Sequence, residues 1–423
     1  MSRLSGSFFD VFAPLKNRNF SVYFAGQGIS LIGTFMQQVA QQWLIWQLSH
    51  DSRMIGVSAA LATLPMLVLG PFSSSLADRM NRRKLLIITQ TAEMTLAFTL
   101  ALYAASGLQE VWPVLVMSLL LGVSAAFTIP AQSAFIGDLS GMGQVRSAYT
   151  IYGMIIETAR LVGPAVAGQV VAWVGTSLAF ALNGLSFIAV IISLLMVRAH
   201  QAPHTSRGNA LADFADSIRF MRSQPRIVDL VLCRVMITLF IFSSLQLAAP
   251  IADEVLHSGP ELVGNMLAAS GAGALVGALL VAPQLQRIRR AGAALCVALA
   301  WSGGWLAVTS FFSTAPTILL GIFLYSVNIP VVLTNVSSLA QLLSPPGMRA
   351  RLGGAMQMIS SGAQPLGALL VGWMGNALGP MLAIRINGVL MTLFAVALFV
   401  FSASFRNWEP APYTEPSLAP ATS

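Results

Sequence analysis

Cysteine, histidine and charged residues are scarce in this sequence of 423 residues, which has two cysteines, four histidines and 9% charged side chains. Cys233 and Cys296 both lie within long apolar stretches, so the sequence offers neither a disulfide framework nor a cluster of metal ligands. The histidines all fall in expected loops, and no nucleophile is paired with a base in a recognisable pattern. We therefore expect no metal, no cofactor and no enzyme activity.

The sequence also lacks two short signals. It has no phosphate-binding loop of the G-x-x-x-x-G-K-[ST] type, so ATP is not indicated as an energy source. Residues 1–20 contain no uninterrupted apolar core followed by a small-residue cleavage site. We therefore expect no cleavable signal peptide.

Apolar residues dominate what remains. Hydrophobic side chains make up 56% of the chain, and the mean hydropathy is +0.75. Apolar stretches of roughly 20 residues, the length of a helix that crosses a membrane core, recur along nearly the whole sequence. Glycine and proline occur inside them, as at Gly271, Gly273 and Pro365, which is typical of helices packed in lipid. We count twelve such stretches and predict an all-α integral membrane protein with twelve transmembrane helices.

The positions of the basic residues predict the orientation in the membrane. All but three of the 23 lysines and arginines fall in one alternating set of segments, the exceptions being Arg53, Arg160 and Arg385. Arg234, in the apolar stretch at 228–251, is counted within that set. Because cytoplasmic loops are enriched in lysine and arginine, we expect both termini and the long central loop in the cytoplasm. The net charge of +8 then reflects topology, and no nucleic-acid partner is implied.

Short sequences recur in the two halves of the chain. Ile129-Pro130 recurs as Ile329-Pro330, and Asn183-Gly184 recurs as Asn387-Gly388. This spacing indicates a duplicated unit, as in transporters that rock two bundles about a site near the midplane. The predicted domains are an N-terminal six-helix bundle at 1–197, a cytoplasmic linker at 198–227, a pseudo-symmetric C-terminal six-helix bundle at 228–404 and a disordered cytoplasmic tail at 405–423.

The loop after the second predicted helix reads S-S-L-A-D-R-M-N-R-R at residues 74–83. It resembles the signature that the major facilitator superfamily carries between helices 2 and 3, with Ser74 and Asn81 in place of two glycines. The resemblance implies a cytoplasmic gate that braces the ends of the bundles in the outward-open state. Charges that only set the topology would explain the same residues. The gate residues that it implies are Asp78, Arg79, Arg82 and Arg83.

The fifth predicted helix contains A-R-L-V-G-P-A-V-A-G at residues 159–168. This segment resembles the Gly-Pro motif that marks exporters of the superfamily, carried here by Gly163, Pro164 and Gly168. Small residues let a helix approach its neighbour closely, and proline allows a bend. Ordinary packing of small residues is the alternative explanation.

Three segments, at 15–20, 25–27 and 36–44, together with Pro130-Ala131-Gln132, resemble the branch that contains enterobactin exporters and macrolide efflux proteins. The resemblance implies a monomeric secondary active transporter in a bacterial inner (plasma) membrane. It would use a coupling cation, expected to be the proton, to expel an amphipathic small molecule such as a siderophore, a macrolide or another drug by alternating access. An importer of the same fold, a lipid flippase and a non-transporting receptor or assembly factor remain alternatives.

Amide side chains inside the predicted helices are candidates for the substrate cavity. Each amide needs hydrogen-bond partners in lipid, which a wet cavity or a neighbouring helix can supply equally well. The cavity candidates are Gln38, Gln41, Asn328, Asn335, Gln357 and Gln364.

Three charged residues well inside the predicted helices are candidates for coupling. Glu157 and Arg160 are three residues apart on the fifth helix, where they can pair near the midplane. We expect Glu157 to bind and release the coupling proton while Arg160 lowers its proton affinity. Glu93, in the third helix, is the next candidate. A purely structural pair would explain the first two as well.

Overall fold

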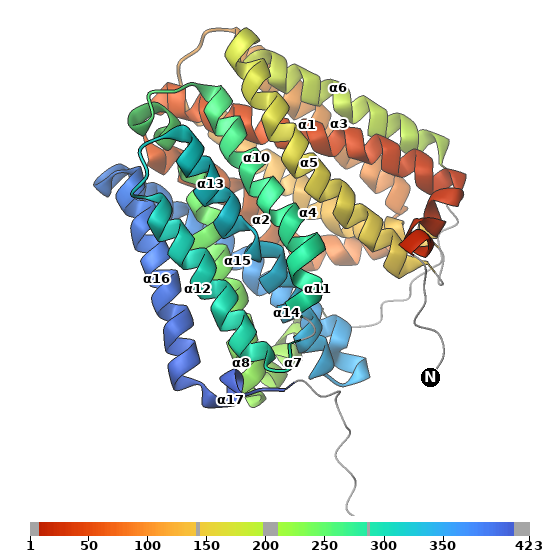
Figure 1. The fold of residues 1–423 in the computed structure, drawn as a ribbon. Helices are drawn as coiled ribbons and strands as arrows, with labels where there is room; N and C mark the ends of the chain where they lie inside the picture. The colour runs from red at the N-terminus through yellow and green to blue at the C-terminus, as the bar shows by residue number, and fades with distance from the viewer. Residues whose placement is uncertain (1–7, 141–143, 198–209, 286–287, 410–423) are drawn as a thin grey trace, which may run out of the picture.

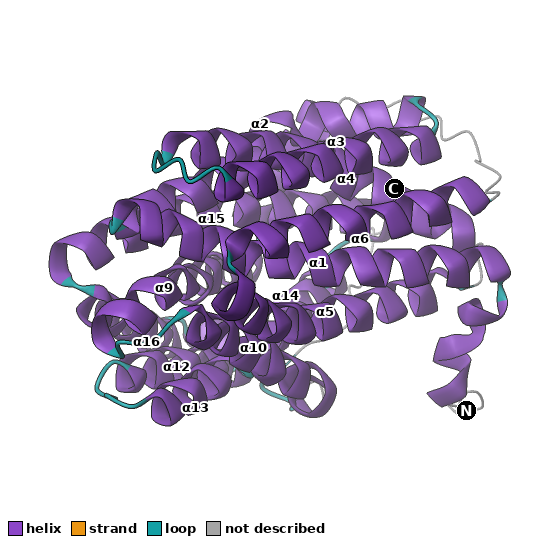
Figure 2. Ribbon diagram, turned by 90° about the horizontal axis from the view of Figure 1, so that it is seen from above, coloured by secondary structure: helices purple, strands orange, loops and turns teal. Residues whose placement is uncertain are grey.

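The computed structural model describes residues 8–140, 144–197, 210–285 and 288–409, and nearly all of them are helical. Figure 2 shows helices joined by short loops, with no strand in this part of the chain. The all-α architecture expected from the apolar stretches is therefore found.

The first half of the chain forms a bundle of six long helices, which lie together in Figure 1. Within it, α1 packs on α5 and α6, α2 packs on α4, and α3 packs on α4 and α6. The helices, which follow the short η1 (Phe8–Lys16), are α1 (Arg18–Ser49), α2 (Ser52–Arg79), α3 (Arg82–Ala105), α4 (Trp112–Ser140), α5 (Val145–Val174) and α6 (Thr176–Met196).

The second half forms a matching bundle in which three spans are interrupted. The seventh span is α8 (Pro225–Met236), η2 (Ile237–Phe242), η3 (Leu245–Leu247), α9 (Ala248–Pro250) and η4 (Ile251–Val255), and the eighth is α10 (Pro260–Val276), η5 (Gly277–Val281) and α11 (Ala282–Leu285). The others are α12 (Ala291–Thr309), α13 (Ala315–Ser326) with α14 (Asn328–Leu342), α15 (Arg349–Leu378) and α16 (Pro380–Phe401), accompanied by the shorter α7 (Ala210–Ser223), η6 (Pro346–Met348) and α17 (Ala403–Arg406). η2, η4 and η5 are π-helical, a geometry that often marks functional sites.

Ten segments of the described chain are both long enough and apolar enough to cross a membrane. α1 and α15 are long enough, with 32 and 30 residues, but are not among the ten. Their hydropathy is lowered by six glutamines in α1 and by two glutamines and two arginines in α15. Together with these two helices the structure has the twelve spans that the sequence predicts.

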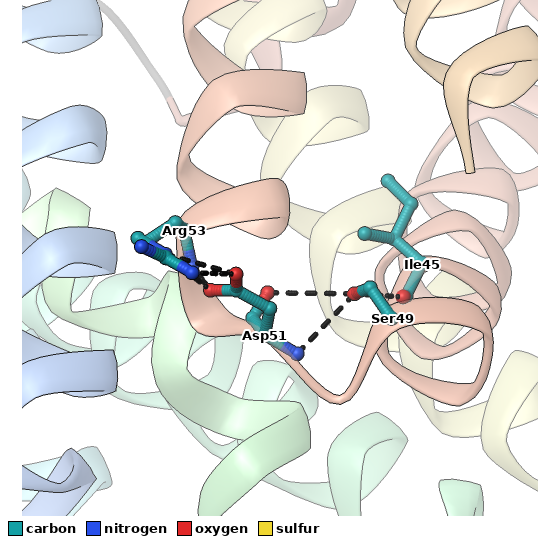
Figure 3. A network of polar contacts seen from close by, with 4 residues as sticks. All are labelled: Ile45, Ser49, Asp51 and Arg53. Atoms are coloured by element: carbon teal, nitrogen blue, oxygen red, sulfur yellow. Dashed lines mark hydrogen bonds and ion pairs between the residues drawn. The ribbon is translucent and has the colours of Figure 1, made fainter.

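The turn between α1 and α2 shows how the local sequence ends one helix and begins the next (Figure 3). His50 adopts the left-handed conformation, with φ of 45°, and donates its backbone N–H to Trp46. Asp51 caps α2 by accepting the backbone N–H of Arg53 at 2.8 Å, and its carboxylate pairs with the Arg53 guanidinium at 2.6 Å. This hydrogen-bonded pair lowers the pKa of Asp51, because it favours the charged carboxylate.

Equivalent glycines begin the last helix of each bundle. Gly175 precedes α6 with φ of 92°, and Gly379 precedes α16 with φ of 85°. Both values lie in the region that glycine adopts without a steric penalty. The same sharp turn therefore joins the last two helices of each bundle, as a duplicated unit predicts.

Equivalent asparagines also make equivalent contacts. The Asn183 amide on α6 donates to Gln37 on α1 at 2.7 Å, and the Asn387 amide on α16 donates to Ser244 in the seventh span at 3.1 Å. Each asparagine thus ties the last helix of its bundle to the first. The buried amides explain why this short sequence recurs.

The two bundles meet along two seams that contain glycine. In one seam α5 crosses α10, which runs beside it in Figure 1, and a Cβ on Gly264 would lie 2.4 Å from the Pro164 carbonyl oxygen. In the other seam α2 crosses α15, and a Cβ on Gly56 would lie 2.4 Å from the Ala368 carbonyl oxygen. Only glycine allows the backbones to approach this closely.

The end of the described chain is packed against the second bundle. Phe405 is 0% exposed and Trp408 is 3% exposed, and the Trp408 carbonyl accepts the backbone N–H of Ala291 at 3.2 Å. The prediction of a disordered tail from residue 405 is therefore wrong for its first residues, because two aromatic side chains bury apolar surface there. The remainder of that predicted tail, 410–423, lies outside the described residues.

Candidate functional site

A cavity of about 330 Å³ lies between the two bundles. Its wall is formed by α1, α2 and α5 of the first bundle and by the seventh, eighth, tenth and eleventh spans of the second. Its volume is at the lower end of the range for small-molecule sites, roughly 300–1,000 Å³. The polar residues that line it are Arg160, Gln38, Gln41, Gln42, Gln246, Gln364, Ser58, Thr63 and Ser270.

Two of the predicted amides face the cavity from opposite bundles. Gln38 on α1 and Gln364 on α15 both line the cavity, and both residues are exposed. Gln41 is held more firmly, because its amide donates to Ser58 at 3.3 Å and to Ser118 at 2.6 Å. The cavity therefore presents hydrogen-bonding groups of both bundles to one shared volume.

Arg160 brings a positive charge to the cavity wall. Its guanidinium donates to the Glu157 carboxylate at 3.3 Å and lies 5.7 Å from the centre of the Phe35 ring. The two side chains meet because the residues are three apart on α5, the spacing from which the pair was predicted. Arg160 lines the cavity, whereas Glu157 is not among its lining residues.

Apolar side chains complete the wall. Phe35 and Phe242 contribute aromatic surface, and Leu267 and Ile329 contribute aliphatic surface. The combination of a guanidinium, several amides and apolar groups suits a molecule that has both an apolar body and hydrogen-bond acceptors.

The glycine seams close the cavity at one end. The seam contacts involve the first part of α2 and the last part of α15, near the turn shown in Figure 3. At the opposite end, which holds the start of α1 and α17, open space surrounds Gly153 on α5 and both Gly353 and Gly354 on α15. Figure 1 shows the helices of the two bundles close together near the seams and diverging toward the opposite end.

Three predicted cavity residues lie elsewhere. Asn328 and Asn335 are buried on α14, and the Asn335 amide donates to the Val331 carbonyl of its own helix at 2.8 Å. Gln357 is exposed on α15 but faces Arg234 in a separate cavity. Helical periodicity in the sequence places each of these residues on a polar face of its helix. It does not show which neighbouring helix that face contacts.

Glu93 is enclosed within the first bundle. It lies on α3 and accepts hydrogen bonds from Ser124 at 2.9 Å, from Thr128 at 2.8 Å and from Gln90 at 3.3 Å. It is not among the residues that line the central cavity. Both carboxyl oxygens have hydrogen-bond partners on α3 or α4, so Glu93 is held within the first bundle.

The predicted gate loop is only partly described. Arg82 forms a pair with Asp138 on α4 at 2.7 Å, and these side chains are 5% and 6% exposed. Arg83 donates to the Leu195 carbonyl of α6 at 2.5 Å. Asp78 and Arg79 lie on the last turn of α2, but their side chains fall outside the described part of the structure.

The predicted helix 5 motif lies at two helix crossings. A Cβ on Gly163 would be 2.8 Å from the Ile32 carbonyl oxygen of α1. A Cβ on Gly168 would be 3.1 Å from the Cα of Gly264 on α10. Pro164 lines the central cavity between them. The motif therefore packs α5 against both its own bundle and the other one.

Arg234 is wrongly counted with the basic residues of the cytoplasmic segments, although the predicted stretch at 228–251 contains it. It lies inside the seventh span, on α8, and not with the charges of the cytoplasmic loops. Its guanidinium donates to Ser360 at 2.6 Å, to Ser337 at 3.0 Å and to Gln357. The sequence signal for this position is that Arg234 follows Pro225 by nine residues, which places it within the membrane span.

Residues 9–419 match the family described as transmembrane secretion effector. Relatives include the enterobactin exporter EntS of Citrobacter koseri, 23% identical with 93% of this chain and 94% of the relative covered. The uncharacterized MFS-type transporter YfiS of Bacillus subtilis is also 23% identical, with coverage of 89% and 91%.

Solved structures of the same fold are more distant in sequence. A bacterial homologue of the human lysosomal transporter Spinster, in an inward-facing and unoccupied conformation, superposes with a TM-score of 0.74 at 15% identity and covers 94% of this chain and 100% of its own. A peptide transporter POT in complex with sulfate gives a TM-score of 0.73 at 12% identity, with 93% and 96% covered.

The family match, together with the helical fold, identifies a multi-pass membrane transporter. The chain belongs to the transmembrane secretion effector family of the major facilitator superfamily.

Proposed function

We propose that this protein is a secondary active exporter that works as a monomer and moves an amphipathic small molecule by alternating access. The observation that carries the proposal is the cavity between the bundles, whose wall comes from both of them. A rocking motion of residues 1–197 against residues 228–404 would expose the same side chains to each side of the membrane in turn.

The cavity wall supports an amphipathic substrate with acceptor groups. Arg160 and the amides of Gln38 and Gln364 can donate to carbonyl, phenolate or carboxylate oxygens, while Phe35 and Phe242 contact an apolar body. Siderophores, macrolides and similar drugs have this combination. A distant relative, EntS, is described as an enterobactin exporter.

The orientation that we propose gives the cavity access from the cytoplasm. With both termini in the cytoplasm, as the distribution of arginine predicts, the separated ends of the bundles face the cytoplasm. A molecule from the cytoplasm or the inner leaflet of a bacterial plasma membrane would then enter the cavity. Cysteine labelling tests this: an impermeant maleimide should label Gln109→Cys and not Thr205→Cys in intact cells, and the reverse pattern contradicts the orientation.

Coupling to protons is proposed to run through Glu157. Arg160 lies within 3.3 Å of Glu157 and also lines the cavity, so substrate that binds the guanidinium weakens its hold on the carboxylate. Substrate binding at Arg160 and the change of conformation would then each alter this contact and, with it, the proton affinity of Glu157. Glu93 is the alternative coupling group.

An importer and a lipid flippase are the competing functions. A deletion strain, its parent and a strain complemented with the wild-type chain should be compared by untargeted analysis of intracellular and extracellular metabolites. Export predicts a compound that accumulates inside the deletion strain and is restored by complementation. Depletion inside the strain would identify an importer, and a change confined to membrane lipids would identify a flippase.

A further inference from the structure

We propose that Arg234 is the centre of a second binding site, which takes an anionic oxygen group such as a carboxylate, sulfonate or phosphate. The site is a separate cavity of about 220 Å³ between α8, α14 and α15, lined by Arg234, Ser337, Gln341, Gly353 and Gln357 among others. Its volume suits a charged head group and not a complete ligand, because ordinary ligand sites measure roughly 300–1,000 Å³.

The guanidinium of Arg234 is surrounded by neutral acceptors. Ser360, Ser337 and Gln357 accept one N–H from each of its three nitrogens. A guanidinium has five N–H donors, so one N–H on each terminal nitrogen remains. Two adjacent N–H groups form the fork that binds a carboxylate, sulfonate or phosphate at two points.

The positive charge of Arg234 is not neutralised by a carboxylate in the described part of the chain. None of the ion pairs recorded there involves it. Asp229, on the same helix, is five residues earlier and therefore about 140° around the axis; its carboxylate accepts a hydrogen bond from Ser402 at 2.9 Å. An uncompensated charge within a membrane span is costly and typically functional, and an anionic ligand would neutralise it.

The Arg234 site lies between the open end of the molecule and the central cavity. Arg234 is nine residues from the start of α8 and Gln357 is eight residues from the start of α15, which places them roughly 12–14 Å along their helices. Arg160 and Gln364, in the central cavity, are each 15 residues from the start of α5 and α15, or roughly 22 Å.

A polar stripe on α15 connects the two sites. Gln357 donates to Ser361 at 3.5 Å, and Gln364 follows one turn later on the same face. Resting on the proposed function, we infer that the transported molecule is an amphipathic anion. Its charged group contacts Arg234 first and then Arg160.

The test measures binding and requires no transport. The full chain, purified in nanodiscs of phosphatidylcholine, is titrated by calorimetry with naphthalene-1-sulfonate and with the uncharged naphthalene-1-sulfonamide. We expect the wild-type protein to bind two sulfonates, and Arg234→Gln and Arg160→Gln to bind one each. For Arg234→Gln the affinity of the lost site should fall at least tenfold, with sulfonamide binding unchanged. Arg385→Gln is the matched control, because Arg385 stacks on Phe311 at 3.9 Å and lines neither cavity.

A second variant keeps the test decisive if Arg234→Gln does not fold. Gly353→Leu fills the Arg234 cavity from a position with open space around its Cβ, and Gly304→Leu adds the same side chain to open space on α12. Gly353→Leu should lose one sulfonate and Gly304→Leu should lose none. The proposal is overturned if Gly353→Leu, or a folded Arg234→Gln, still binds two sulfonates with wild-type affinity.

A further experiment with an anionic lipid distinguishes a lipid phosphate from a soluble anion as the natural ligand. If phosphatidylglycerol in the nanodisc competes with the sulfonate in the wild-type protein but not in Arg234→Gln, the site takes a lipid phosphate. If it does not compete, the site takes a soluble anion. Both results support an anion site, and neither depends on a gradient, so failure of export in liposomes would contradict the proposed function alone.

Discussion

The indole N–H of Trp46 donates a hydrogen bond to the Asp253 carboxylate at 2.8 Å and so joins α1 of the first bundle to η4 of the second. Trp46 is 2% exposed, and the His50 ring lies 5.5 Å from it, edge to face. A second bond, from the Gln42 amide to the Leu245 carbonyl at 3.0 Å, also crosses between the bundles. Both bonds lie at the closed end of the cavity and must break before that end opens.

We expect Trp46→Phe to favour opening at that end. A hydrogen bond to a charged group contributes about 1.5–3 kcal/mol, so its loss should raise the population of the opened state by roughly tenfold or more. The readout is the labelling rate of Gln38→Cys, in the cavity, by an impermeant maleimide added outside. Trp112→Phe is the control, because Trp112 bonds to Glu110 within the same bundle. Equal rates in the two variants would show that Trp46 does not hold the closed end.

We expect Gly264→Ala to disturb the α5–α10 seam. The new Cβ would lie 2.4 Å from the Pro164 carbonyl oxygen, so the two backbones must separate. The closed end should open, and the melting temperature of the purified protein should fall by several degrees. Gly304→Ala, where nothing lies within 4 Å of the new Cβ, should leave the melting temperature unchanged or slightly raised. The same melting temperature in both variants would contradict this account.

We expect Arg82→Gln to destabilise the first bundle. Its partner Asp138 is 6% exposed and would be left as an unpaired buried charge, which costs about 3–5 kcal/mol. Arg219→Gln is the matched control, since the pair that Arg219 forms with Asp216 is solvent-exposed on both sides. Thermal unfolding in detergent measures the difference. Similar melting temperatures for the two variants would show that Arg82 contributes little.

We expect Asp78→Asn to impair transport while leaving expression and membrane insertion largely intact. The carboxylate in the corresponding superfamily signature biases one of two bundle arrangements, so its loss should slow cycling without unfolding the bundle. Transport in liposomes, normalised to the protein inserted, is the measurement. Full transport by the variant would reduce Asp78 to a marker of topology.

We expect Glu157→Gln to bind substrate but to lose accumulation driven by a proton gradient. The amide cannot gain and lose a proton, so substrate movement is no longer tied to proton movement, while exchange at equal pH on both sides continues. Reconstituted liposomes with and without a pH difference distinguish these activities. If the variant still accumulates substrate against its gradient when a pH difference is applied, Glu93 becomes the candidate.

The sequence by itself determined the fold class and several local features. Long apolar stretches require helices in lipid, because every backbone polar group must be paired within its own segment. The pairing of Glu157 with Arg160 follows from helical spacing over one turn. The recurrence of Asn183-Gly184 as Asn387-Gly388 is visible in the sequence, and the two asparagines make equivalent contacts.

Only the tertiary structure decided which helix faces meet across the bundles. Gln357 and Gln364 share one polar stripe, yet one faces Arg234 and the other faces the central cavity. The predicted stretch at 228–251 already contains Arg234, but only the structure shows that its guanidinium meets Ser337 on α14 and Gln357 on α15. Helical periodicity fixes the direction of a side chain relative to its own helix, whereas the crossing of helices from distant parts of the chain decides what that side chain contacts.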